Sequence, residues 1–259
     1  MSGACAQLLS GLCAILPLMF IAWLISVWRR NVAIVDVFWG LAVAGAGFGW
    51  LMASGTRSTR AQLVMVLATL WALRLAVHIL WRGWGQPEDR RYRNIRARNE
   101  PSFALKSLYL VFALQAILAW VVALPLYGAV RSTVPLGILD LLGVALWVVG
   151  FAFEAVADWQ HAAFQRRNGS SDSVLDLGLW RYSRHPNYFG EFCSWWGMWL
   201  LALSGGAWWS IAGPALLTFL LLRVSGVALT EKDIAERRPA YLDYRRRTSA
   251  FVPRPPLIL

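Results

Sequence analysis

The sequence has few of the features that soluble enzymes use to hold metals or nucleotides. Its three cysteines, Cys5, Cys13 and Cys193, have neither the spacing of a metal site nor that of a disulfide framework. No Gly-x-Gly-x-x-Gly motif follows a predicted strand, which excludes a Rossmann dinucleotide site. Repeats, low-complexity linkers and a basic segment ahead of the first apolar run are also missing. We therefore expect no metal site, no second domain and no cleavable signal peptide.

Long apolar runs make up most of the chain. Hydrophobic residues account for 58% of the sequence and the mean hydropathy is +0.50, far from the average of soluble domains. A helix needs roughly 20 residues to cross a bilayer core. Seven runs approach or reach that length, and they cover Leu9–Trp28, Val32–Ala53, Leu63–Trp81, Leu108–Val130, Val134–Ala157, Tyr188–Leu203 and Trp208–Leu229. We predict an all-α integral membrane protein with seven transmembrane helices. It forms a single transmembrane domain (1–259), with three helices and a basic loop in 1–107 and the remainder in 108–259.

The basic residues are distributed unevenly between alternate loops. Of 25 basic residues, 20 lie after the first, third and fifth runs or in the tail from Lys232 onward, whereas the other loops hold only Arg57, Arg60 and Arg131. The positive-inside rule then places the N-terminus outside and the C-terminus in the cytoplasm. This distribution explains the net charge of +11 through membrane topology, so we expect membrane lipids and no nucleic acid as partners. No obligate protein partner is predicted. The excess of arginine over lysine favours a bacterial inner membrane.

Several ionisable residues lie within or beside the apolar runs, where charge is costly and indicates function. They are Asp36 in the second run, Arg74 and His78 in the third, Glu154 and Asp158 in the fifth, and Glu191 in the sixth. Ion pairs that only join helices, such as Arg74 with Asp36 or Arg166 with Glu154, are the alternative for any one of them. Most of these residues lie toward the cytoplasmic half, near the arginine-rich loop RGWGQPEDRRYRNIRARNE (82–100). We predict a polar cavity that opens to the cytoplasm, with guanidinium groups suited to phosphates.

The segment GLWRYSRHPNYFGEF (178–192) is polar and lies between two apolar runs. Gly178 allows the chain to turn back toward the bilayer, and Pro186 suits the first turn of a helix, where its missing N–H has no helical partner. Asn187 and Glu191 are four residues apart, so they share one face of that helix. An amide and a carboxylate placed together can hydrogen-bond both groups of a carboxamide.

Three stretches together resemble a known family. GLWRYSRHPNYFGE, preceded by EAVADWQHAAFQRR and followed by AERRPAYLDYRRRTSAFVPRPP, is similar to the C-terminal half of the steroid 5-alpha-reductase family. The similarity is strongest to its bacterial branch, the DUF1295 group, and NVAIVDVFWG and EDRRY also look like that branch. Sterol C14 and delta-7 reductases share the general pattern. A looser version, with Arg-His-Pro and a later Tyr-x-x-Tyr, belongs to isoprenylcysteine and phospholipid methyltransferases.

The resemblance implies a seven-helix reductase that holds NADPH in a cavity open to the cytoplasm. Asn187 and Glu191 match the motif that contacts the nicotinamide end, and Asp158 matches an aspartate on the adenosine side. Arg74 falls where the family places a phosphate-binding arginine. The full set implied for the cofactor is Arg74, Arg82, Glu154, Asp158, Arg184, His185, Asn187, Glu191 and Tyr244.

The second and third runs depart from the steroid reductases, which carry a Gln-Glu pair and a tyrosine there to polarise the enone carbonyl. This chain has Asp36 and Trp71 near those places. Hydride delivery to a conjugated double bond leaves an enolate that must be stabilised and protonated. We predict Asp36 as the acid, with His78 as the second choice, and a pairing role for Asp36 as the alternative.

Three functions remain open from the sequence. The first is NADPH-dependent reduction of a conjugated double bond in a steroid-like or other lipid enone. The second is methyl transfer from S-adenosylmethionine to a lipid or prenylated thiol. The third is a sterol- or lipid-binding membrane protein without catalysis. The arginine-rich loop and the Asn187-x-x-Gly190-Glu191 motif favour the first.

Overall fold

The structure, a computed structural model, describes residues 2–168, 173–224, 226–227, 231 and 241–257. Within these residues the regular structure is helical, apart from one isolated β-bridge between Ser183 and Ser249. The chain forms two compact units. Unit 1 comprises Met1–Gly137 with Leu201–Gly213, and unit 2 comprises Ile138–Leu200 with Pro214–Leu259.

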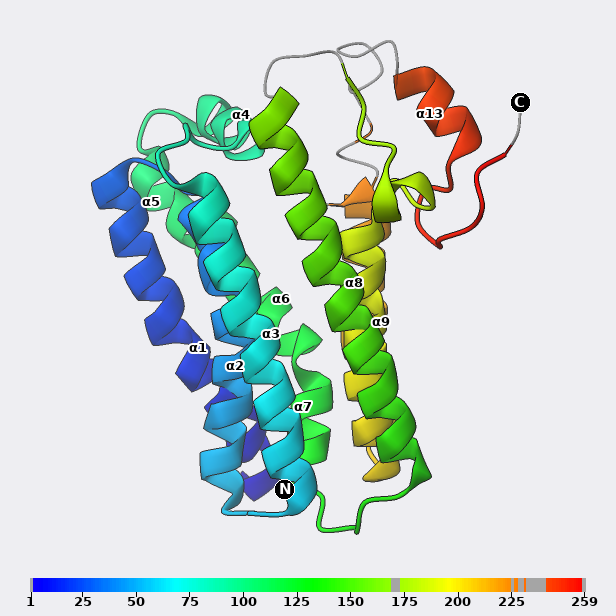
Figure 1. The fold of residues 1–259 in the computed structure, drawn as a ribbon. Coiled ribbons are helices and arrows are strands. Elements are labelled where there is room, and N and C mark those ends of the chain that lie inside the picture. The colour runs from blue at the N-terminus through cyan, green and yellow to red at the C-terminus, as the bar shows by residue number, and fades with distance from the viewer. Residues whose placement is uncertain (1, 169–172, 225, 228–230, 232–240, 258–259) are drawn as a thin grey trace. The chain divides into compact units, whose positions relative to one another are not determined.

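Unit 1 is a bundle of long helices together with several short ones (Figure 1). Its elements are α1 (Ser2–Arg29), α2 (Ile34–Ser54), α3 (Thr59–Gly83), α4 (Arg90–Asn99), α5 (Phe103–Ser107), the π-helical turn η1 (Leu108–Ala113), α6 (Leu114–Val122), α7 (Leu124–Val130) and the 3-10 turn η3 (Trp208–Ile211). Helices α5, η1 and α6 follow one another directly, so they form one continuous span from Phe103 to Val122.

Helix α2 lies at the centre of unit 1 and contacts α1, α3, α6 and α7. Its sequence is rich in glycine and alanine, which allows neighbouring backbones to approach closely. A Cβ atom at Gly49 would lie 2.8 Å from the Ser10 carbonyl oxygen of α1, and one at Gly40 would lie 3.2 Å from Cα of Ala72 in α3. The small residues therefore determine how closely these helices pack.

Arg60, at the start of α3, is almost completely buried and joins separate segments of unit 1. Its guanidinium donates to Ser132 Oγ at 2.8 Å, to the Val134 and Pro135 carbonyls at 2.8 and 3.1 Å, and to Ser204 Oγ at 3.0 Å. The sequence predicted Arg60 only as a loop charge. These four hydrogen bonds anchor the start of α3 to residues 132–135 and to Ser204.

Unit 2 is built on two long helices that lie side by side (Figure 1). Its elements are α8 (Ile138–Asn168), the 3-10 turn η2 (Gly178–Arg181), most of α9 (Pro186–Ser204) and of α10 (Ala212–Phe219), the π-helical turn η4 (Leu220–Val224) and α13 (Tyr241–Arg247). Glycines lie along the contact between α8 and α9. A Cβ at Gly190 would lie 2.4 Å from the Glu154 backbone nitrogen, and one at Gly197 would lie 2.6 Å from the Gly143 carbonyl.

Five helices in the described residues are long and apolar enough to cross a membrane. They are Cys5–Arg29, Ile34–Ser54, Thr59–Gly83, Phe103–Val122 and Ile138–Arg167. They overlap the first five predicted runs, so the prediction of an all-α integral membrane protein is confirmed at this level. Which membrane contains the protein stays a prediction, as does the division into 1–107 and 108–259 within a single domain.

Seven spans, and the orientation of the termini, are not supported. The sixth predicted run coincides with α9, which is long enough but carries Asn187, Glu191 and three tryptophans that lower its hydropathy. The seventh run is divided into η3, α10 and η4, and its apolar helix Trp208–Val224 is short. Residues 225 and 228–229 of that run lie outside the described residues. So do Lys232, Arg237 and Arg238, three of the predicted cytoplasmic charges.

Candidate functional site

The turn that leads into α9 has the geometry that the sequence predicted. Gly178 has φ of 59°, a left-handed conformation that favours glycine, and a Cβ there would lie 2.3 Å from the Gln160 side chain. Gln160 Oε1 instead accepts a hydrogen bond from the Leu179 backbone N–H at 3.0 Å. Helix α9 then begins at Pro186. The turn η2 is thus fastened to the C-terminal part of α8, and this fixes the direction in which α9 starts.

Polar side chains of α8 and α9 meet at the first turn of α9. Asn187 Nδ2 donates to Asp158 Oδ1 at 3.2 Å, and Glu154 is buried one turn earlier on α8. Among the described residues, Asn187 Oδ1 is buried and has no hydrogen-bond partner. Glu191 follows Asn187 by four residues on α9 and is half-buried. The structure therefore brings Asn187 into contact with Asp158 and leaves an acceptor atom of Asn187 unsatisfied. The cofactor contacts predicted for Asn187, Asp158, Glu154 and Glu191 stay predictions.

An aromatic cluster lies beside these polar groups in unit 2. The ring of Phe189 packs edge-on against Phe153 of α8 at 5.7 Å and against Phe251 of the C-terminal segment at 5.9 Å, and Phe192 packs edge-on against Phe251 at 5.6 Å. Apolar rings around a polar site reduce solvent access, which strengthens any hydrogen bond formed there.

Arg184 and His185 both bind Glu231, which the sequence did not indicate as a site residue. Arg184 contacts the two carboxylate oxygens at 2.7 and 2.9 Å, and His185 Nε2 lies 2.9 Å from Oε1. Burial by itself would raise the pKa of Glu231. Hydrogen bonds from His185 and Arg184, together with their charges, outweigh burial and lower the pKa to about 2. Glu231 is therefore held as the anion.

The remaining donors of Arg184 bind the C-terminal segment. Its Nη1 donates to the carbonyls of Arg245 and Thr248, and its backbone N–H donates to the Ser249 carbonyl at 2.8 Å. The hydroxyl of Tyr244 donates to the Trp180 carbonyl in η2. These contacts give Arg184 and Tyr244 a positioning role: they fasten the tail to the entrance of α9. Their predicted cofactor contacts stay predictions.

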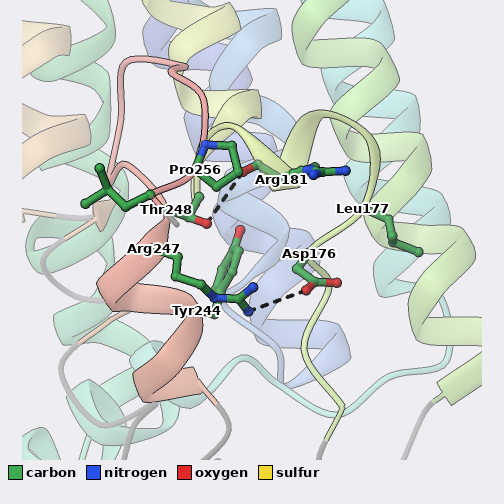
Figure 2. Close-up of a pocket in the computed structure, with 8 residues that line it drawn as sticks. Asp176, Leu177, Arg181, Tyr244, Arg247, Thr248 and Pro256 are labelled. Atoms are coloured by element: carbon green, nitrogen blue, oxygen red, sulfur yellow. Dashed lines mark hydrogen bonds and ion pairs between the residues drawn. The ribbon is translucent and has the colours of Figure 1, made fainter. Parts of the chain in front are cut away.

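A cavity of about 390 Å³ opens between η2 and the C-terminal segment of unit 2 (Figure 2). It is lined by Asp176, Leu177, Arg181, Tyr244, Arg247, Thr248, Pro256 and Leu257. An ion pair of 3.8 Å between Arg247 and Asp176 crosses its rim, and Thr248 Oγ1 donates to the Arg181 carbonyl at 3.5 Å. Tyr244 is the predicted site residue that contributes to this lining.

In unit 1 the carboxylate of Asp36 accepts from two residues of α4. Arg91 Nη2 lies 2.9 Å from Oδ2, and the hydroxyl of Tyr92 lies 2.5 Å from Oδ1. Burial and the neighbouring Asp36 charge raise the pKa of Tyr92 well above its usual value, so the phenol stays a donor. Both carboxylate oxygens are thus used as acceptors, which favours an anchoring role for Asp36 over the role of acid. The sequence missed Arg91 and Tyr92 as its partners, although both stand in the quoted EDRRY stretch.

The other predicted residues of unit 1 lie on α3. Arg74 and His78 are half-buried and share a face, as their spacing predicted, and the His78 ring lies 6.4 Å from that of Trp81. Arg82 is exposed in the last turn. A common cavity for these residues and for those of unit 2 stays a prediction.

The fold and the site define a class: a helical integral membrane protein with a buried polar cluster where α8 meets the start of α9. A family model described as a protein of unknown function (DUF1295) matches residues 22–248, and the chain belongs to this family. The resemblance to the DUF1295 group is thereby confirmed, while the bacterial branch stays a prediction. An uncharacterized protein of Schizosaccharomyces pombe is 25% identical over 268 residues, which cover 90% of this chain and 76% of the yeast protein. No solved structure matches the chain significantly.

Proposed function

We propose that the protein is a membrane-embedded NADPH-dependent reductase of a conjugated C=C bond in a steroid-like or other lipid enone. The observation that carries the proposal is the buried, unsatisfied Oδ1 atom of Asn187 among the described residues. A buried acceptor without a donor costs about 1–3 kcal/mol, so its presence favours a ligand that supplies the donor. The carboxamide of a nicotinamide has such an N–H₂ group.

The chain's own residues fit that group. Asp158 accepts from Asn187 Nδ2, and this contact orients the amide so that Oδ1 is the acceptor left for a ligand. Glu191, one turn later on the same face of α9, is a second acceptor. Glu154 and Asp158 are buried carboxylates suited to accept hydrogen bonds from hydroxyl or amino groups. Bound NADPH would supply a hydride for reduction of the double bond.

The phosphates and the proton require further residues, which we propose from the resemblance. Arg74 and Arg82 would bind phosphates through their guanidinium forks. Asp36 or His78 would donate the proton to the substrate. Asp36 could donate a proton only after its hydrogen bonds with Arg91 and Tyr92 break, which favours His78 as the proton donor. Seven transmembrane helices with the N-terminus outside belong to the same proposal.

Titration of the purified full-length protein in detergent tests the proposal. We expect NADPH to bind more tightly than NADH, and Glu191→Ala and Asn187→Ala each to weaken NADPH binding about ten- to a hundredfold while the protein still folds. Binding of S-adenosylmethionine alone would instead favour a methyltransferase. Binding of a sterol or lipid without either cofactor would favour a non-catalytic lipid-binding protein.

A further inference from the structure

The arginines of α4 lie on two sides of this helix, one toward the rest of unit 1 and one away from it. The inward face holds Arg91 and Arg96, which bind carboxylates: Arg91 binds Asp36 and Asp89, and Arg96 binds Glu88 at 2.9 and 3.0 Å. Asp89 also caps α4, because its side chain accepts a hydrogen bond from the Arg91 backbone N–H at 2.8 Å. These pairs fix the orientation of α4 on unit 1.

The outward face of α4 carries basic charge and no acidic residue. Its exposed members are Arg90, Arg93, Asn94, Ala97 and Arg98. At 100° per residue they span roughly 140° of the helix surface, an unbroken sector opposite the buried Tyr92. We call these five residues the basic face of α4.

The basic face belongs to the end of unit 1 where the long helices leave the apolar layer. Helix α4 lies beyond the C-terminal end of α3 and at the same end as the C-terminus of α1 (Figure 1). Exposed tryptophans mark this end: Trp28 is 83% exposed at the end of α1, and Trp84 is 67% exposed just after α3, with the Arg29 guanidinium 5.3 Å from its ring. Tryptophan is enriched at membrane–water interfaces, so these rings mark the headgroup level.

From this placement we infer that the basic face of α4 binds the anionic phospholipid headgroups of the membrane that contains the protein. The partner is identified by charge complementarity: exposed guanidinium groups held at headgroup depth match phosphodiester oxygens. The carboxylates of Asp36, Asp89 and Glu88 bind Arg91 and Arg96. The rigid attachment through Asp36 and Glu88 keeps the face turned outward, which lowers the entropic cost of binding. The basic face does not include Arg74 or Arg82, which are proposed for the cofactor phosphates, and the polar cluster of that proposed site lies on α8 and α9.

Titration of phosphatidylglycerol against phosphatidylcholine with the same acyl chains tests the inference. Both lipids are added to the purified full chain in neutral detergent, and bound lipid is counted by native mass spectrometry. Wild type binds phosphatidylglycerol more tightly. The double variant Arg93→Gln/Arg98→Gln loses about fivefold in affinity per arginine, roughly thirtyfold together, which corresponds to ~1 kcal/mol per basic residue at a membrane surface. Its thermal unfolding stays that of wild type, because both side chains are exposed.

A matched control removes the same charge elsewhere. Arg167→Gln/Arg245→Gln changes two exposed arginines of unit 2 and keeps the phosphatidylglycerol affinity. An equal loss in both double variants would show that net charge, rather than the basic face, determines lipid binding, and would overturn the inference. The inference would also be overturned if inorganic phosphate bound as tightly as phosphatidylglycerol. Loss of NADPH affinity without loss of lipid affinity in the α4 variant would assign these arginines to a cofactor instead.

Discussion

Replacement of Asn187 by leucine separates a ligand-binding amide from a helix-packing one. The substitution keeps the number and branching of the side-chain heavy atoms but removes two features: the hydrogen bond of 3.2 Å to Asp158 and the unsatisfied buried Oδ1. Loss of a hydrogen bond to a charged group costs about 1.5–3 kcal/mol, and removal of the unsatisfied acceptor returns about 1–3 kcal/mol. The two effects offset one another, so we expect the free energy of unfolding without ligand to change by less than about 1.5 kcal/mol.

Ligand binding should respond differently. At an NADPH concentration 100 times the wild-type Kd, wild type gains about 2.7 kcal/mol of stability, whereas a variant whose Kd is ten times higher gains about 1.4 kcal/mol. Thermal unfolding with and without NADPH, followed by tryptophan fluorescence in detergent, measures this difference.

A control on the same helix should show the opposite pattern. Ser194 is buried in α9, and its hydroxyl donates to the Gly190 carbonyl at 3.0 Å, so Ser194→Ala loses a satisfied bond worth about 1 kcal/mol. We expect this variant to be less stable and to keep its full response to NADPH. If Asn187→Leu responds to NADPH as wild type does and is only less stable, Asn187 is a packing residue and the reasoning is refuted.

Three further predictions concern the frame of the site. Gly190→Ala places a Cβ 2.4 Å from the Glu154 backbone nitrogen, so α9 must shift. We expect about 1–3 kcal/mol of destabilisation and weaker NADPH binding. The control Gly83→Ala, where the added Cβ meets open space, should leave thermal unfolding unchanged. The lowered pKa of Glu231 contributes stability that is present above pH 4.5 and is lost as the pH falls toward 2. We expect Glu231→Gln to remove this part of the pH dependence in thermal unfolding measured over a pH series. An unchanged pH profile would contradict the prediction. Arg60→Met leaves the buried Ser132 hydroxyl and the part-buried carbonyls of Val134 and Pro135 without their donor, so we expect about 1–3 kcal/mol of destabilisation. A wild-type melting temperature would contradict the anchoring role of Arg60.

Local features of the site could be predicted because they depend on residues a few positions apart. Gly178 and Pro186 are where the chain needs a left-handed residue and a helix start, and the structure has φ of 59° at Gly178 and begins α9 at Pro186. The spacing of Asn187 and Glu191 required only a regular helix. The apolar length of the first five runs likewise needed no knowledge of tertiary contacts.

Contacts between distant residues could not be predicted in the same way. Asp36 and Arg91 are 55 residues apart, and Arg184 and Glu231 are 47 apart. Periodicity does not indicate which of many arginines meets which carboxylate, because the choice depends on how the helices pack. The described residues do not support the sixth and seventh runs as spans, for two local reasons. Asn187, Glu191 and three tryptophans lower the hydropathy of α9, and the apolar helix Trp208–Val224 is short.

The small molecule that stays bound through purification shows which cofactor, if any, the protein holds. The full-length wild-type chain would be extracted in mild detergent, denatured, and its released small molecules identified by mass spectrometry, with Asn187→Leu as the matched control. We predict release of NADPH or NADP⁺ from wild type and much less from the variant. Release of S-adenosylmethionine without any nicotinamide nucleotide would contradict this prediction.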